Sequence, residues 1–201
     1  MNILTLFDQQ QVSALKSRQW PIGSLGAAIE PYTADQLIKE RTPSVVLLSA
    51  GDTDVFMLRA REHLYELFLV HEHLSIADLG HLISGPDDLP EIMARLISYG
   101  SFPILLAPDQ SLTYQIYQAY CRLERTVNLI SVDDKPDLEE SGALLGEGNW
   151  LSYVLSHEPN YLFNYTLVGH QNYLSNPEML RSLELLHFDI HRLGQVRQSG
   201  E

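Results

Sequence analysis

Short, mostly apolar runs alternate along the chain with segments of helical periodicity. The runs occupy 44–49, 75–79, 102–106, 127–132 and 161–168. Bounded by Gly, Pro or polar residues, such runs are typical of strands buried on both faces of a parallel sheet. Apolar positions recur at helical spacing in 55–70, 88–99, 111–123 and 149–157. The alternation predicts an α/β fold with about five predominantly parallel strands and helices on both faces of the sheet.

The stretch 101–137 contains the clearest unit of this alternation. An apolar run at 102–106 leads into the polar turn 107–111 and a helix, and a second run at 127–132 leads into the polar turn 133–137. Strand, helix and strand within about 30 residues predict a right-handed βαβ crossover between parallel strands. Ligands bind beyond the carboxyl ends of the strands in such sheets. We therefore expect both polar turns to lie at one edge of the sheet, where chemistry would be placed.

The two turns carry motifs that resemble those of arginase, agmatinase and formimidoylglutamase, the ureohydrolases. In that family one strand runs into Gly-Gly-Asp-His-Ser-Leu and the next into Asp-Ala-His-x-Asp. Here the first motif reads Ala-Pro-Asp-Gln-Ser-Leu at 107–112, and the second reads Asp-Asp-Lys-Pro-Asp at 133–137. Further likeness lies in Ile-Ala-Asp-Leu-Gly at 76–80 and Tyr-Leu-Phe-Asn-Tyr at 161–165. The resemblance covers roughly 43–197, is greatest to divergent formimidoylglutamase-like members, and implies a three-layer, arginase-like α/β/α sheet.

The resemblance also implies where a metal centre would lie, and the sequence departs from the family there. In the family, the first motif's His and the second motif's Asp, His and Asp ligate two manganese ions. This chain has Gln110, Asp133, Lys135 and Asp137 at those positions, so both imidazoles are replaced. Asp133 and Asp137 are the residual ligand positions, and the family's later Asp-x-Asp pair has no counterpart before Glu201. We expect no metal cofactor and no catalytic residue in this chain.

Lys135 itself suggests a replacement for the metal. An ammonium group between two carboxylates would repel a divalent cation and attract the carboxylates. We expect Lys135 to neutralise Asp133 or Asp137 at a position that the metal holds in the family. The alternative is that Lys135 points into solvent and the aspartates cap turns.

Polar residues that follow the predicted strands are the candidate lining of a pocket at the same edge. They are Asp109, Asp134, His81, His170 and Gln171. Together with Asp133 and Asp137, the acidic members of this set would suit a cationic guanidinium group. The alternative is a polar edge made of solvated turns.

Two histidine pairs have spacings that metal sites use, and we interpret both as ordinary surface or boundary residues. His71 and His73 lie in a polar connection between a helix and a strand. His187 and His191 are four residues apart in a helix expected over 176–193, but the glutamate of the metalloprotease pattern is missing.

Composition narrows the classes of partner. The chain has 13 Lys and Arg against 26 Asp and Glu, a net charge of −13. This charge repels phosphate backbones and anionic lipids, so we expect neither nucleic-acid nor membrane binding. No stretch approaches about 18 apolar residues and the N-terminus has no basic region, which predicts a cytoplasmic protein. Cys121, the only cysteine, is expected to be a buried, inert thiol.

The domain boundary is expected near residue 41. Residues 1–41 are the least family-like, and we expect them to form an N-terminal arm that covers a sheet edge, with short helices at 8–17 and 33–39. Residues 42–201 would form an arginase-like α/β domain that lacks its C-terminal strands. Because the missing strands would expose an edge or part of a sheet face, we expect a homo-oligomer or a partner chain to cover it.

Three functions are compatible with the sequence. The first is a non-catalytic arginase-like domain with a structural, regulatory or interaction role. The second is the N-terminal half of a hydrolase of linear amidines (guanidino or formimidoyl compounds) that later sequence completes. The third is a metal-free binder of a small guanidino, amidino or amino-acid ligand at the old cleft.

Overall fold

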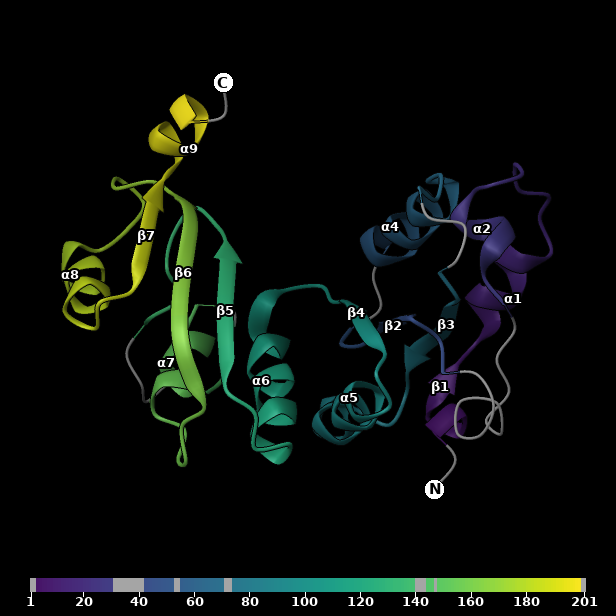
Figure 1. Cartoon of the computed structure of the whole chain (residues 1–201), viewed down its shortest axis with the longest axis horizontal. Helices are drawn as coiled ribbons and strands as arrows, with labels where there is room; N and C mark the ends of the chain where they lie inside the picture. Colours follow the sequence, from purple (N-terminus) through teal and green to yellow (C-terminus); the bar gives the residue numbers. More distant parts are fainter. Residues whose placement is uncertain are drawn as a thin grey trace. The chain divides into compact units, whose positions relative to one another are not determined.

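The chain folds into two compact units, each with its own sheet (Figure 1). The computed structural model describes residues 3–30, 42–52, 55–70, 74–139, 144–146 and 148–199. The units are Met1–Asp109, here the N-terminal unit, and Gln110–Glu201, here the C-terminal unit. Both sheets are mostly parallel, so the fold is α/β. No helix in the described part of the chain is long and apolar enough to cross a membrane.

The N-terminal unit is built on a four-stranded sheet of order β1-β3-β2-β4. Strand β2 (Val45–Ser49) pairs in parallel with β3 (Ile76–Leu82) and with β4 (Phe102–Leu106). Strand β1 (Phe7–Asp8) pairs antiparallel with β3, so the N-terminal segment covers that edge of the sheet. The helix predicted at 33–39 lies outside the described residues.

Helices and an apolar core complete this unit. The helices are η1 (Ile3–Leu6), α1 (Gln10–Lys16), α2 (Leu25–Ala28), α4 (Val55–Glu66), η2 (Pro86–Asp88) and α5 (Leu89–Ser98). Residues from α1, α4, β2 and β3 meet in a buried cluster that includes Leu15, Ile29, Leu47, Tyr65 and Ile76. Burial of such side chains contributes about 1.5–3 kcal/mol each, which is what fixes these helices on the sheet.

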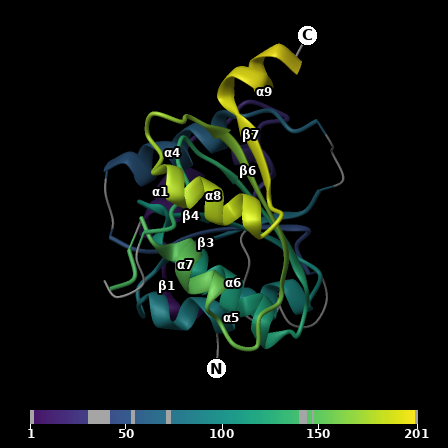
Figure 2. The same cartoon turned by 90° about the vertical axis from the view of Figure 1, so that its left-hand side faces the viewer.

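The C-terminal unit is built on a three-stranded parallel sheet with β6 (Leu162–His170) in its centre. Strands β5 (Val127–Val132) and β7 (Asp189–Arg192) flank it. The helices are η3 (Gln110–Leu112), α6 (Thr113–Arg122), α7 (Trp150–Leu155), α8 (Pro177–Leu185) and α9 (Leu193–Ser199). The core joins α6, α7 and α8 to β6 and consists of Tyr117, Trp150, Leu151, Val154, Tyr165, Leu167 and Leu183. Figure 2 shows α9 extending beyond the carboxyl end of β7.

The expectation that the strands at 102–106 and 127–132 belong to one sheet is wrong. Strand β4 is the last strand of the first sheet and β5 is an outer strand of the second, so each has an unpaired edge among the described residues. The predicted burial of these runs on both faces is also wrong. Phe102 of β4 is 68% exposed, and Ile130 and Val132 of β5 are 67% and 78% exposed. An apolar run predicts that the side chains of a strand are buried. Among the described residues, nothing buries these side chains of β4 and β5.

The single helix predicted over 176–193 is also wrong. Helix α8 ends at Leu185, His187 takes a left-handed φ of 59°, and β7 follows in parallel register with β6. Backbone pairing with β6 therefore overrides the helical spacing of the apolar residues. His187 lies in the turn and His191 in β7, so they do not share a helical face. The pair His71 and His73 lies outside the described residues.

Gly80 allows the N-terminal segment to pair with β3. Its φ is +86°, and a Cβ atom at this position would lie 2.1 Å from the carbonyl oxygen of Asp8 in β1. Gly100 has nearly the same φ, +85°, but a Cβ there would meet nothing within 4 Å. The two glycines therefore separate the cost of the backbone conformation from the cost of the steric overlap.

Replacing Gly80 with Ala should destabilise the chain more than replacing Gly100 with Ala. Gly100→Ala is expected to cost about 1–2 kcal/mol, because a left-handed φ disfavours a side chain. Gly80→Ala should cost about 1–3 kcal/mol more, because β1 must move away from β3. Urea unfolding followed by circular dichroism measures both. Equal midpoints for the two variants would contradict the close approach of β1 to Gly80.

Candidate functional site

The two motif turns come together in the C-terminal unit through Gln110 and Asp133. Gln110 begins η3, and Asp133 directly follows β5. The Nε2 of Gln110 donates a hydrogen bond of 2.5 Å to Oδ2 of Asp133. The other carboxylate oxygen of Asp133 accepts from the backbone N–H of Asp134 at 2.6 Å. Both oxygens of this residual ligand position are therefore bonded within the chain.

Asp137, the other residual ligand position, is part of the packing of α7. It is 3% exposed, and its Oδ2 accepts a hydrogen bond of 2.7 Å from the indole N–H of Trp150. Its carbonyl oxygen accepts from the backbone N–H of Leu151 at 3.2 Å. Because Trp150 and Leu151 belong to the core, Asp137 ties the loop after β5 to the start of α7.

Lys135 is exposed. Neutral donors reach the neighbouring carboxylates, from Gln110 and the backbone of Asp134 to Asp133 and from Trp150 to Asp137. These contacts favour the alternative in which Lys135 points into solvent, and the built-in cation stays a prediction. Asp134 is also exposed, while its carbonyl oxygen accepts from the backbone N–H of Gln171 at 2.7 Å. Asp109 is an exposed residue at the end of the N-terminal unit.

The donor set of these turns does not fit two manganese ions. Such a centre needs about six protein ligands, mostly carboxylate oxygens with one or two imidazoles. No group of three or more His, Cys, Asp or Glu side chains able to hold a metal occurs among the described residues. A Gln110 that donates its N–H to Asp133 presents a hydrogen atom where the family presents a ligand nitrogen.

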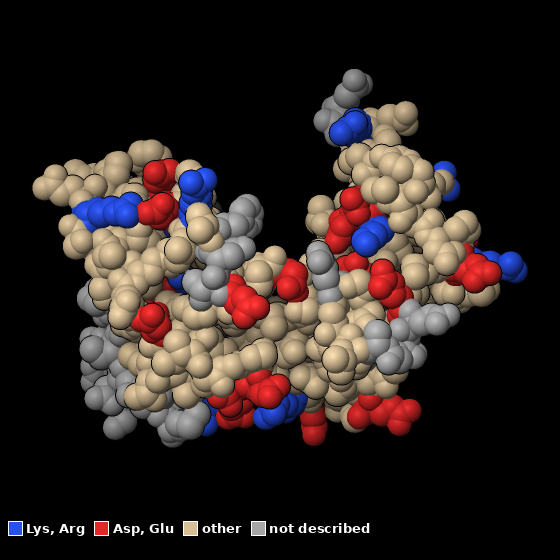
Figure 3. All heavy atoms as spheres, turned by 180° about the vertical axis from the view of Figure 1, so that it is seen from behind, with Lys and Arg blue, Asp and Glu red and all other residues tan. Residues whose placement is uncertain are grey.

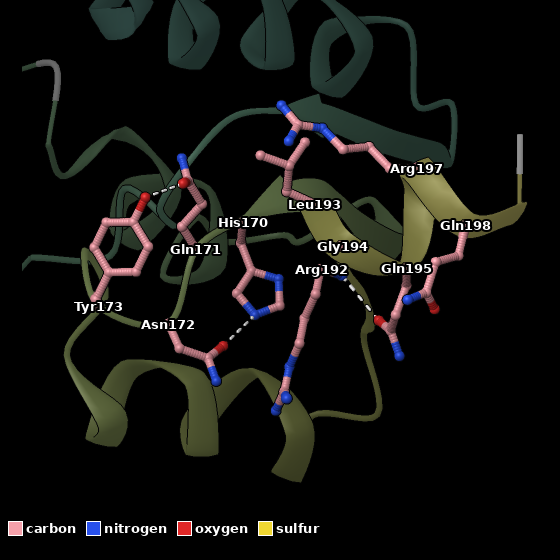
Figure 4. Close-up of a pocket in the computed structure, with 10 residues that line it drawn as sticks. All are labelled: His170, Gln171, Asn172, Tyr173, Arg192, Leu193, Gly194, Gln195, Arg197 and Gln198. Atoms are coloured by element: carbon pink, nitrogen blue, oxygen red, sulfur yellow. Dashed lines mark hydrogen bonds between the residues drawn. The ribbon is translucent and has the colours of Figure 1, made fainter.

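His170 and Gln171 lie at the carboxyl end of β6 and line a cavity there (Figure 4). His170 is 3% exposed, and its Nε2 lies 3.1 Å from Oδ1 of Asn172. Its other ring nitrogen, Nδ1, is buried and has no hydrogen-bond partner among the described residues. The side-chain oxygen of Gln171 accepts from the hydroxyl of Tyr173.

His81 belongs to the N-terminal unit and lines a small cavity of about 80 Å³. Its Nδ1 lies 3.1 Å from Oγ of Ser49, and the guanidinium of Arg61 donates to the same Ser49 oxygen at 3.1 Å. Burial lowers the pKa of His81, and the charge of Arg61 lowers it further. Because the guanidinium of Arg61 is hydrogen-bonded inside this small cavity, it stabilises the fold and leaves little room for a ligand beside His81.

Sequence reasoning missed the buried ion pair of Arg61 and Asp78. Their side chains are 2% and 0% exposed, and Nε of Arg61 lies 3.1 Å from Oδ2 of Asp78, a close charge contact that is not an aligned hydrogen bond. Tyr65 donates its hydroxyl to Oδ2 of Asp78 at 3.1 Å, and the backbone N–H of Gly80 donates to Oδ1 at 2.9 Å. Burial raises the pKa of Asp78, while Arg61 and these two donors act in the opposite direction. The available signal was spacing, because Arg61 falls four residues after Met57 and four before Tyr65, on the buried face of α4.

Removing the charge of Asp78 should strongly destabilise the chain. Asp78→Asn leaves the buried guanidinium of Arg61 without a carboxylate, which costs about 3–5 kcal/mol in comparable pairs. The exposed Asp87 offers a matched control, since Asp87→Asn removes the same charge and should change stability by less than about 0.5 kcal/mol. Urea unfolding of the two variants measures the difference. Similar stability of both would show that the pair contributes no more than a surface charge.

Comparison with known proteins identifies the fold. No protein-family model and no curated protein matches the sequence. Among solved structures, formimidoylglutamase from Bacillus subtilis matches with a TM-score of 0.72 at 14% identity, over 91% of this chain and 64% of that chain. The Mn²⁺-bound formiminoglutamase of Trypanosoma cruzi matches with a TM-score of 0.67 at 16% identity, over 85% and 68% of the two chains. Agmatine ureohydrolase of Thermoplasma volcanium matches with 0.61 at 15%, over 94% and 67%.

These similarities show that the chain has an arginase-like α/β fold, at a sequence identity that speaks for the fold alone. The predicted fold class is thereby confirmed. The chain spans slightly less than two thirds of the length of the Bacillus subtilis structure, 64%.

Proposed function

We propose that this chain is a non-catalytic arginase-like domain whose role is to associate with another polypeptide. The observation that carries the proposal is the hydrogen bonding of the two residual ligand positions. Asp133 accepts from Gln110 at 2.5 Å, and Asp137 accepts from Trp150 at 2.7 Å. To bind a metal through the same oxygen, each carboxylate must break the hydrogen bond that it accepts from Gln110 or Trp150. The release of the Trp150 N–H in a dry core costs about 1–3 kcal/mol.

The same contacts disfavour the cationic ligand that the acidic turns suggest. A guanidinium group binds best to two free carboxylate oxygens in a bidentate contact. Both oxygens of Asp133 already accept hydrogen bonds, and Asp137 is buried against Trp150. Asp134 is exposed, which leaves a solvated carboxylate rather than a built recognition site. A metal-free guanidino site in these turns is therefore the weakest of the three functions.

The second candidate, the N-terminal portion of a longer hydrolase of linear amidines, has support of a different kind. Strands β4 and β5 each have an unpaired edge among the described residues, and the chain spans 64% of the Bacillus subtilis structure. Strands from later sequence would pair with these edges. An Asp-x-Asp pair after a buried strand beyond Glu201 would favour this candidate over a non-catalytic domain.

Exposed apolar residues on β5 support association with another polypeptide. Ile130 and Val132 are two residues apart, so they project from the same face of the strand. They are 67% and 78% exposed although their sequence is that of a buried strand. Unpaired edges next to exposed apolar side chains promote strand pairing between chains. We assign this face to a second copy of the chain.

The isolated chain is expected to bind no Mn²⁺ with sub-micromolar affinity. Isothermal titration calorimetry measures the affinity, and assays with formimidoylglutamate, agmatine and arginine in the presence of Mn²⁺ measure turnover. The reason is the loss of both imidazoles and the bonding of Asp133 and Asp137 within the chain. Sub-micromolar binding or turnover by the unmodified chain would end the proposal of a non-catalytic domain.

The matched control for this titration is the double variant Gln110→His and Lys135→His. It restores both imidazoles and removes the hydrogen bond that Gln110 donates to Asp133. Measurable but weak Mn²⁺ affinity is expected, since the indole N–H of Trp150 still holds Asp137. If the variant binds no more Mn²⁺ than the unmodified chain, the two replaced histidines are not what excludes the metal.

The chain is also expected to self-associate through β5. Size-exclusion chromatography with light scattering over a concentration series should give a mass above that of the monomer, and Ile130→Glu with Val132→Glu should restore the monomer. Leu144→Glu is the matched control, because Leu144 is 94% exposed and lies outside the sheet. A clean monomer of the unmodified chain at high concentration would contradict the assignment.

A further inference from the structure

A cavity separate from the motif turns lies at the carboxyl ends of β6 and β7 (Figure 4). Its volume is about 420 Å³, within the range of small-ligand sites. One wall is the segment that begins with His170 at the end of β6, and the other is the segment from Arg192 into α9. The carboxyl edge of a parallel sheet is where ligands bind in this class of fold.

The lining of this cavity is cationic in a strongly acidic protein. Arg192 and Arg197 line it, and its lining contains no Asp or Glu among the described residues. The chain as a whole has 26 acidic residues against 13 basic ones, and acidic side chains are spread over the face seen in Figure 3. Within the described part of the chain, neither arginine forms an ion pair. Figure 4 shows their guanidinium groups pointing to opposite sides of the cavity, so an anionic group that enters can meet a cationic donor on either side.

Glutamine side chains add further donors to the same walls. Oε1 of Gln171 accepts from the hydroxyl of Tyr173, and Oε1 of Gln195 accepts from the backbone N–H of Arg192 at 3.0 Å. These bonds orient the two amides. The NH₂ group of Gln171 can only donate. It adds to the donors that the two arginines offer to acceptor oxygens of a ligand.

His170 supplies a buried polar atom that the fold itself does not use. It is 3% exposed, and its Nδ1 has no partner in the described part of the chain. An unsatisfied buried polar group costs about 1–3 kcal/mol, and a bound ligand can remove that cost. A protonated ring offers Nδ1–H to an anionic oxygen, and a neutral ring with its hydrogen on Nε2 accepts from a hydroxyl of the same ligand.

A second cavity, of about 330 Å³, shares His170 and Arg192 and includes Glu184 of α8. The carboxylate of Glu184 makes this second cavity less suitable for an anionic group than the first. A ligand that reaches past His170 meets one carboxylate there, whereas the lining of the first cavity includes no carboxylate among the described residues. The anionic end of a ligand therefore belongs in the first cavity.

We propose that this cavity binds a small organic or inorganic oxyanion, a carboxylate or a phosphate, held by Arg192 and Arg197 and by Nδ1 of His170. The site does not depend on the motif turns or on a metal, so it goes beyond the role in association proposed above. The proposed ligand is an anion, whereas the acidic motif turns suggest a cationic guanidinium ligand. The lining of the cavity comes from the last residues of β6 and β7 and from the residues that follow them, whereas the degenerate motif positions follow β4 and β5.

Isothermal titration calorimetry of the full chain with inorganic phosphate, with succinate and with agmatine tests the proposal. One or both anions should bind, and the tighter of the two identifies the source of the oxyanion. Agmatine, a guanidino cation, should not compete for the site. Absence of binding by both anions, or equal competition by agmatine, would overturn the proposal.

Matched arginine variants locate the binding. Arg192→Gln and Arg197→Gln should each weaken anion binding about 10-fold or more, because each removes a charge-assisted contact. Arg181→Gln on the exposed side of α8 removes the same charge outside the cavity and should change affinity less than about 2-fold. All three positions are exposed, so the variants should retain the fold. An equal loss in Arg181→Gln would show attraction by net charge alone and overturn the site.

Two substitutions of His170 separate its ring nitrogens. His170→Gln can keep a polar group near the position of Nε2, where the bond to Asn172 is made, while it removes Nδ1. His170→Asn keeps a polar group near Nδ1 and removes Nε2. Binding should be weakened more by the Gln variant than by the Asn variant, with thermal melts to show that both fold. The opposite order would contradict a role for Nδ1.

Discussion

The hydrogen bond from the indole N–H of Trp150 to the carboxylate of Asp137 fixes how the C-terminal unit can use its carboxyl edge. Trp150 is 1% exposed and packs against Tyr165 with a ring-centroid distance of 6.4 Å. An indole N–H is a donor that needs an acceptor when it is buried. The loop after β5 supplies that acceptor, so Asp137 holds α7 on the core. Asp137 therefore contributes to the packing of this unit.

The neighbouring positions follow the same rule. Gln110 in place of an imidazole gives Asp133 a donor, and the backbone N–H of Asp134 gives it another. Carboxylates that would repel each other without a metal are thus stabilised by neutral donors, and no lysine is needed to balance them. At the end of β6, by contrast, His170 has a buried ring nitrogen without a partner in the described residues. This contrast is why we propose an anion site at the ends of β6 and β7 rather than at the motif turns.

Local sequence patterns predict the positions of most strands but not which strands pair. The apolar runs predict β2, β3, β4, β5 and β6 as strands, although β4 and β5 expose apolar residues that the prediction placed in the core. The prediction that β4 and β5 share a sheet is wrong, since adjacency in sequence does not decide which strands share a sheet. The apolar residues of 176–193 have helical spacing, which predicts helix where β7 forms, and the pairing of β7 with β6 is not visible in that spacing.

The site was predicted less well than the fold for a related reason. The motif positions were identified by their sequence, but the partner of Asp137 is 13 residues away in α7, and Asp78 is 17 residues from Arg61. Arg192 at the end of β7 and Arg197 in α9 belong to no sequence motif, and only the structure shows that they line a cavity together with His170. Charge and spacing in the sequence can identify candidate residues. Their roles depend on contacts between elements that are distant in the sequence, and these contacts are seen only in the structure.

We infer that Asp133 and Asp137 stabilise the fold at the positions where the arginase-like motifs would place metal ligands. Anomalous diffraction from a crystal of the chain soaked in MnCl₂ tests it most directly, because it locates each bound ion and each side chain together. The account predicts no manganese peak between Asp133 and Asp137, with the bonds from Gln110 and Trp150 intact. A peak ligated by both carboxylates, with the Trp150 indole turned away from Asp137, would contradict it.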